Sequence, residues 1–104
     1  MGVTEPLIPE HVEKVARMVA EAVRAVLGPE ARIIWYGSWV RGQAAARSDL
    51  DIAYEAAGPV SIADRIRLSE EVGDLPTLYD VDLVDLHRAG AALRDEILRH
   101  GVPL

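Results

Sequence analysis

The chain has 104 residues, of which 50% are hydrophobic and 27% charged, and its formal net charge is −6. This length is typical of one domain, and the composition is that of a folded protein, not of a disordered one. The chain contains no cysteine, which excludes disulfide bonds, thiol catalysis and cysteine-based zinc sites. Its acidic balance argues against a long nucleic acid as a ligand, because the phosphates would be repelled.

Hydrophobic residues do not gather into long stretches. No uncharged stretch exceeds eight residues, as in 33–40 and 56–63, whereas a membrane-spanning helix needs about 20 apolar residues. The first residues also lack the basic start and apolar middle of a secretory signal. We therefore expect no membrane contact and a cytoplasmic protein.

The first half of the chain shows two helical patterns around a strand pattern. Valines spaced three and four residues apart predict a helix over 9–27, which Gly28 and the following proline end. β-branched and aromatic residues predict a buried strand over 31–36. Helix formers follow over 38–46, interrupted by Gly42, and predict a short second helix.

The second half alternates in the same way. Residues 49–54 predict a strand with one apolar and one acidic face. Ser61 and Asp64 resemble a capping box, which predicts a helix that runs from there to about Val72. Residues 81–86 predict the third strand.

A closing helix is predicted over 88–100, with Leu93, Ile97 and Leu98 facing inward. The order of elements is then α-β-α-β-α-β-α, without an internal repeat or a linker. We therefore expect one α/β domain over residues 1–104, with helices packed against a small sheet.

Two short motifs are suited to phosphate and metal chemistry. Gly37 and Ser38 directly follow the first strand, where free backbone N–H groups and a hydroxyl favour phosphate oxygens. Asp49 and Asp51 are two residues apart on a strand, so they share one face, with Cα atoms about 7 Å apart. Two such carboxylates can share hard divalent cations, which relieve their mutual repulsion. The histidines show no metal-ligand spacing, so we expect oxygen ligands, with Asp82 as a third.

The combination of Gly-Ser, ten residues, Asp-x-Asp and a later strand with one Asp resembles the nucleotidyltransferase superfamily that includes DNA polymerase beta and kanamycin nucleotidyltransferase. The fuller string Gly-Ser-x-x-Arg-Gly-x5-Ser-Asp-x-Asp begins at Gly37, and residues 93–102 read Leu-Arg-Asp-Glu-Ile-Leu-Arg-His-Gly-Val. Together they look like the minimal nucleotidyltransferases (MNT) encoded beside HEPN-domain proteins in HEPN/MNT toxin–antitoxin pairs. The resemblance covers the chain from about residue 10 to its end.

This resemblance implies a nucleotidyltransferase fold of the α+β type, in which helices flank a small mixed sheet. It implies ATP as a substrate with two Mg²⁺ ions, and transfer of AMP to a hydroxyl of a HEPN toxin, often a tyrosine. The toxin would be an RNase, and this protein would be its antitoxin.

The resemblance also implies two sets of site residues. The nucleotide-binding set is Gly37, Ser38 and Arg41. The set that holds metal and is catalytic is Asp49, Asp51 and Asp82. The third carboxylate stays open among Asp80, Asp82 and Asp85, and the family pattern of an apolar residue, Asp and two apolar residues favours Asp82. Asp82 is also the candidate general base.

Other interpretations remain beside these. Arg41 could pair with an acidic neighbour, and Trp39 could stack on adenine, although core packing is the commoner role of such an aromatic residue. The rival function is a binding antitoxin that covers its partner's active site without chemistry, and the presence of all three carboxylates argues against it. An antibiotic adenylyltransferase is a weaker alternative because a substrate-binding domain is absent. Self-association into a homo-oligomer is left open.

Overall fold

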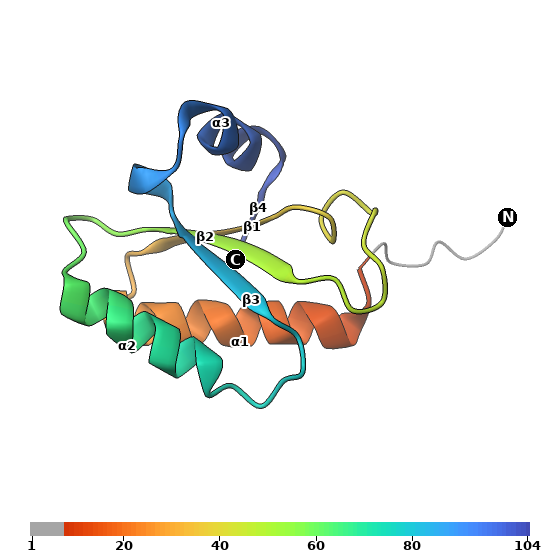
Figure 1. The fold of residues 1–104 in the computed structure, drawn as a ribbon, viewed down its shortest axis with the longest axis horizontal. Helices are drawn as coiled ribbons and strands as arrows, with labels where there is room; N and C mark the ends of the chain where they lie inside the picture. The colour runs from red at the N-terminus through yellow and green to blue at the C-terminus, as the bar shows by residue number, and fades with distance from the viewer. Residues whose placement is uncertain (1–7) are drawn as a thin grey trace, which may run out of the picture.

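A mixed four-stranded sheet forms the centre of the molecule (Figure 1). The computed structural model describes residues 8–104. The strands are β1 (Arg32–Tyr36), β2 (Leu50–Glu55), β3 (Val81–Asp85) and β4 (Val102–Pro103). Their order is β3-β2-β1-β4, in which β1 is antiparallel to both neighbours and β2 is parallel to β3. The expected small mixed sheet is confirmed.

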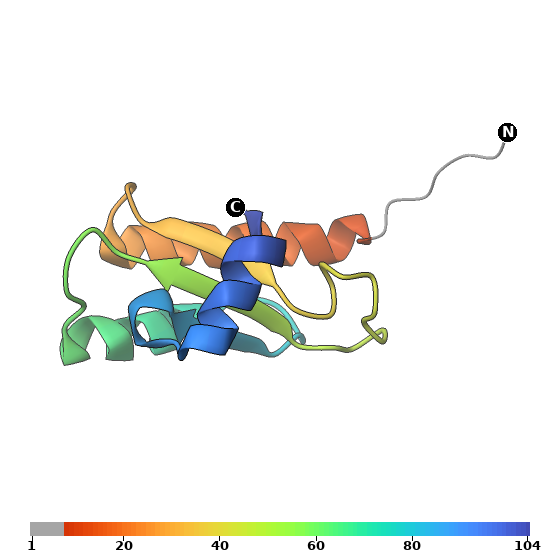
Figure 2. The same ribbon diagram turned by 90° about the horizontal axis from the view of Figure 1, so that it is seen from above.

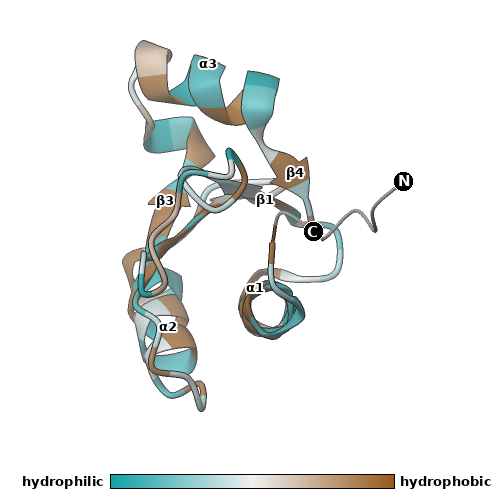
Figure 3. Cartoon of the chain, turned by 90° about the vertical axis from the view of Figure 1, so that its right-hand side faces the viewer, coloured by the Kyte–Doolittle hydropathy of each residue, from teal (hydrophilic) through white to brown (hydrophobic). Residues whose placement is uncertain are grey.

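Helices cover both faces of this sheet (Figure 1 and Figure 3). α1 (Glu10–Leu27) and α2 (Ile62–Gly73) pack against each other on one face. A 3₁₀ turn, η1 (Leu86–Arg88), and α3 (Ala91–His100) lie on the other face, where α3 crosses over the strands (Figure 2). No helix of the described residues is long and apolar enough to span a membrane. The first residues, where no secretory signal is expected, lie outside the described part of the chain.

The larger hydrophobic core lies between the sheet and the pair α1 and α2. The valine stripe predicted for the first helix is buried here, with Val12, Val19 and Val23 all at 0% exposure. Strand residues such as Trp35 and Ile52 pack against it. The predicted N-cap is confirmed as well, because the Ser61 side chain accepts a hydrogen bond from the backbone N–H of Asp64 at 3.0 Å.

A smaller core lies on the opposite face of the sheet. Ile34 and Tyr36 of β1, Ala53 of β2, Leu86 of η1 and Ile97 of α3 form one buried cluster. The two central strands therefore bury side chains on both faces, which explains why 33–36 is a continuous apolar run and not an alternation.

The helix predicted over 38–46 is wrong: the structure has a single helical turn there. The Arg41 N–H donates to the Gly37 carbonyl at 3.1 Å, which closes the one turn. Gly42 then adopts a φ of +71°, and the Gln43 N–H donates back to the Ser38 carbonyl at 2.9 Å. This left-handed glycine cap ends the turn, and it outweighs the helix propensity of the alanines that follow.

The end of the chain also differs from the prediction. The helix predicted over 88–100 is split, because η1 ends at Arg88 and α3 begins at Ala91. Leu98 is 46% exposed, and therefore does not face inward as predicted, whereas Ile97 is fully buried. Leu93 and Ile97 are four residues apart and share a helix face, from which Leu98 is turned by about 100°. The structure adds β4, a two-residue strand that pairs with β1.

Ile97→Ala should lower the free energy of unfolding by about 2–4 kcal/mol, because it opens a cavity in the smaller core. Leu98→Ala, one position further along the same helix, should change it by less than about 0.5 kcal/mol, because Leu98 is largely in solvent. Urea unfolding of both variants measures the difference. Similar losses for the two variants would mean that α3 does not pack through Ile97.

Candidate active site

Three strands place one side chain each in a row on the face that α3 covers. Tyr36 of β1 is the register partner of Asp51 of β2, and Asp51 is the register partner of Asp82 of β3. Register partners on neighbouring strands point to the same face of a sheet, about 5 Å apart. Tyr36 belongs to the core cluster under α3, so both carboxylates lie on that face too.

Asp51 lies at the centre of a group of charges. Partial burial is the largest cause of its raised pKa, and the negative charges of Asp82, Asp49 and Glu96 raise it further. Arg41 acts in the opposite direction and lowers the pKa. Asp49, which directly precedes β2, is exposed to solvent. Asp49, Asp82 and Arg41 are therefore all close enough to Asp51 for their charges to act on it.

Tyr36 is a further member of this group. Burial, followed by the charges of Asp51, Asp82 and Glu96, raises the pKa of its phenol to about 12. The phenol therefore stays protonated at neutral pH, and it contributes a neutral hydroxyl beside the carboxylates.

The carboxylates have the chemistry of a site for a hard cation, since all their donors are oxygens and their charges repel one another at rest. Across residues 8–104, no three carboxylate or histidine side chains meet around one point so as to hold an ion as they stand. The metal assignment of Asp49, Asp51 and Asp82 therefore stays a prediction.

The turn after β1 lies directly against Asp51. Gly37 has a φ of +87°, and a Cβ atom added there would overlap the Asp51 carboxylate. Only glycine fits this position, because it has no Cβ and tolerates the left-handed backbone. Ser38 and Arg41 follow within the same turn. A single turn provides N–H groups and a hydroxyl for phosphate oxygens, but less of the dipole that the predicted helix would have added.

Among the three candidates for the third carboxylate, Asp82 alone is in register with Asp51. Asp85 is in register with Tyr54 on the other face, where it forms an ion pair with Arg65 at 3.2 Å. The second oxygen of Asp85 accepts a hydrogen bond from a backbone N–H of η1. Asp80 precedes β3. These positions favour Asp82.

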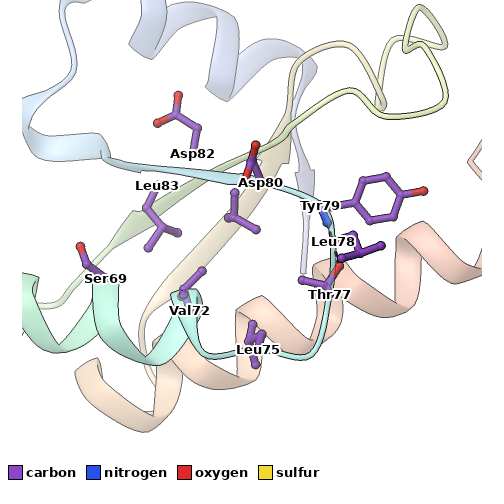
Figure 4. Close-up of a pocket in the computed structure, with 11 residues that line it drawn as sticks. Ser69, Val72, Leu75, Thr77, Leu78, Tyr79, Asp80, Asp82 and Leu83 are labelled. Atoms are coloured by element: carbon purple, nitrogen blue, oxygen red, sulfur yellow. Dashed lines mark hydrogen bonds between the residues drawn. The ribbon is translucent and has the colours of Figure 1, made fainter.

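A cavity of about 470 Å³ lies along β3 beside Asp82 (Figure 4). It is lined by the end of α2, by the loop that follows and by β3 itself. In Figure 4, Asp82 and Asp80 project away from α2, whereas Leu83 points toward it. Asp82 thus belongs both to the row that it forms with Asp51 and to the lining of this cavity.

The structure distinguishes between the alternative roles of Trp39 and of Arg41. Trp39 is 6% exposed, and its Nε1–H donates to the Ser48 carbonyl at 2.8 Å. Its ring meets Tyr79 edge to face, so Trp39 is a packing residue and does not stack on adenine in this arrangement. Arg41 does pair with an acidic neighbour, because its Nη1 lies 3.1 Å from Oε1 of Glu96 on α3.

Sequence reasoning gave no role to Tyr36 or Glu96. Tyr36 directly precedes Gly37, the first residue of the quoted motif. It lies two residues after Ile34 on β1, so both side chains point to the face of the sheet that carries the site. Glu96 lies in the closing segment 93–102, directly before the buried Ile97. Only the packing of α3 over the sheet could show that Glu96 reaches Arg41.

Gly37→Ala should lower the free energy of unfolding by more than Gly42→Ala does. Both alanines would take a left-handed φ, at a cost of about 1–2 kcal/mol, but only the Cβ at Gly37 would meet Asp51; at Gly42 it would enter open space. Urea unfolding of the two variants provides the comparison. Equal losses would show that the turn does not lie against Asp51.

Asp51→Asn should raise the free energy of unfolding at pH 7. Folding raises the pKa of Asp51, so the folded state binds the proton of this carboxyl more tightly than the unfolded state does. The stability gained in this way is present below the ordinary aspartate pKa and is lost as the pH rises through the raised pKa of the folded state. The gain over wild type should therefore vanish near pH 3, below the ordinary aspartate pKa of about 3.9. Asp95→Asn, outside the group of charges, is the control and should not stabilise. A gain that persists at pH 3 would contradict this origin.

Comparisons with known proteins agree with this geometry. The family described as Polymerase beta, Nucleotidyltransferase matches residues 29–104, and a search of curated proteins finds no significant match. The structure is similar to a chain of a toxin–antitoxin complex with AMP-PNP, with a TM-score of 0.69 and 28% identity, covering 85% of this chain and 70% of that one.

Two further solved structures are similar. One is the complex of a tri-AMPylated Shewanella oneidensis HEPN toxin with its MNT antitoxin, with a TM-score of 0.65 and 25% identity, covering 88% of this chain and 69% of that one. The other is described as a minimal nucleotidyltransferase, with a TM-score of 0.66 and 24% identity, covering 99% of this chain and 100% of that one. The family match includes the Gly-Ser turn, the Asp-x-Asp pair and β3, and the fold is that of a minimal nucleotidyltransferase. This chain therefore belongs to the Polymerase beta nucleotidyltransferase family.

Proposed function

We propose that this protein transfers AMP from Mg-ATP to a hydroxyl of a HEPN-domain toxin, and is thereby the antitoxin of a HEPN/MNT pair. The observation that carries the proposal is the row formed by Tyr36, Asp51 and Asp82, with the Gly37 turn packed against its centre. Two of the similar structures support the choice of reaction, one with AMP-PNP and one with an AMPylated HEPN toxin. In this proposal, residues 1–104 act as one minimal nucleotidyltransferase domain.

The carboxylates of Asp49, Asp51 and Asp82 would hold the Mg²⁺ ions. Oxygen donors of this kind suit Mg²⁺, and a cation would offset the repulsion of Asp51 by the negative charges of Asp82 and Asp49. When bound, Mg²⁺ supplies positive charge to the phosphates and lowers the pKa of the acceptor hydroxyl. We assign two ions, as the family resemblance implies.

The chain's own groups would bind and orient the nucleotide. The backbone N–H groups of the turn and the Ser38 hydroxyl would hold the terminal phosphates, with the Arg41 guanidinium near the triphosphate. The acceptor oxygen then forms a bond to the α-phosphorus, the bond to pyrophosphate breaks, and the hydroxyl proton passes to Asp82. Asp82 is exposed to solvent, so an incoming hydroxyl can reach its carboxylate.

A second candidate is a binding antitoxin that neutralises its partner by forming a complex. The observations that favour it are the Arg41–Glu96 ion pair and the absence, within residues 8–104, of three ligands around one point. Both are properties of a site that is not poised for chemistry.

The amount of antitoxin needed separates the two candidates. One part of wild type should inactivate ten parts of the HEPN partner when ATP and Mg²⁺ are supplied, because an enzyme turns over. The Asp49→Ala, Asp51→Ala double variant should not, because the metal ligands are gone. Residual RNase activity of the partner measures protection, and mass spectrometry detects AMP on the partner.

The Asp74→Ala, Asp95→Ala double variant is the matched control, because it removes two exposed carboxylates outside the site and should protect as wild type does. All variants are first checked for folding. Protection by the Asp49, Asp51 double variant equal to wild type, in proportion to the complex formed, would reject AMP transfer in favour of the binding antitoxin.

A further inference from the structure

The ion pair between Arg41 and Glu96 connects two parts of the site. Arg41 ends the helical turn after β1, and Glu96 lies on α3, which crosses the same face of the sheet. Their side chains are 47% and 35% exposed, so the pair lies at the surface of the site, open to a ligand. The guanidinium that the proposed function directs to phosphates is therefore already bound to a carboxylate.

Both partners also act on Asp51. Arg41 lowers its pKa and Glu96 raises it, so each is close enough to influence the central carboxylate. The neighbouring residue on α3, Asp95, pairs instead with Arg99 on the same helix at 2.9 Å. The arrangement around Arg41 is thus particular to Glu96 and is not shared by the other acidic residue of this helix.

Phosphate oxygens and a carboxylate compete for the same donors. A guanidinium recognises either group best through two parallel N–H bonds, so the N–H groups that Arg41 gives to Glu96 are not free for phosphate oxygens. Binding of a nucleoside triphosphate to Arg41 therefore requires this pair to open.

We propose that Glu96 is a positioning residue, which holds Arg41 beside the Gly37–Ser38 turn until the phosphates of a nucleoside triphosphate displace the Glu96 carboxylate. This inference rests on the proposed function, because it takes Arg41 as a phosphate ligand. Since the pair must open, it lowers the affinity for nucleotide, and by linkage a bound nucleotide loosens the contact between the turn and α3.

Isothermal titration with Mg²⁺ and AMP-PNP tests the inference without any acceptor. Glu96→Gln should tighten binding about two- to fivefold, which is the range expected for opening an exposed ion pair. Asp95→Asn removes the same charge from the same helix and should leave the affinity unchanged. Glu96→Asp keeps the charge on a shorter side chain and should bind no tighter than Glu96→Gln.

The Arg41→Gln background distinguishes competition from simple repulsion. If Glu96 acts through Arg41, adding Glu96→Gln to Arg41→Gln should bring no further gain in affinity. If Glu96→Gln still tightens nucleotide binding in the Arg41→Gln background, the inference is overturned, because the charge of Glu96 alone would account for the effect. The same holds if Asp95→Asn tightens binding as much as Glu96→Gln does. Weaker binding by Glu96→Gln would also overturn it and would make Glu96 part of the ligand set.

The outcome also separates this inference from the proposed function. Wild type that binds AMP-PNP, together with an unchanged Glu96→Gln variant, would reject the inference alone. Wild type that does not bind AMP-PNP would reject both. Urea unfolding of each variant confirms that the measured affinities belong to folded protein.

Discussion

The pairing of β2 with a neighbour on each side is the constraint on which the site depends. Asp51 faces Tyr36 across one ladder and Asp82 across the other. Side chains alternate between the faces of a strand, so a shift of β3 by one residue would turn Asp82 toward α2 and bring an apolar side chain into the row. The larger core opposes such a shift, because Val81 and Leu83 of β3 pack against it. Burial on one face thus determines the chemistry on the other.

The helix on the site face has two roles in consecutive residues. Ile97 is buried in the smaller core and holds α3 on the sheet, while Glu96 reaches the turn after β1. Partial burial and the negative charges around it raise the pKa of Asp51, so its ionised form is unfavourable to folding at neutral pH. The two hydrophobic layers that stabilise the sheet hold Asp51 in place in spite of this cost.

Local patterns predicted much of this fold. The valine stripe predicted α1, the Ser61 capping box predicted α2, and the spacing of Asp49 and Asp51 identified the acidic strand. The prediction failed over 38–46, where helix propensity is high but Gly42 takes a left-handed φ and stops the helix after one turn. It also missed β4, since two residues are too few for any periodic pattern, and their pairing depends on β1, far away in the sequence. The ion pair between Glu96 and Arg41 could not be predicted either, because it also depends on the packing of segments that are far apart in the sequence.

β3 is an edge strand of the described sheet and contains the two aspartates Asp82 and Asp85. An edge strand offers backbone groups to any other strand, and proteins commonly guard such edges with charge. Asp82 is exposed on this strand and Asp80 is exposed just before it, whereas Asp85 pairs with Arg65, so a second copy approaching edge to edge would meet the charges of Asp80 and Asp82. Carboxylates that the proposed function assigns to chemistry would therefore also disfavour the addition of a strand at this edge. Neutralising Asp82 would then lower this protection of the edge along with any role in the proposed reaction.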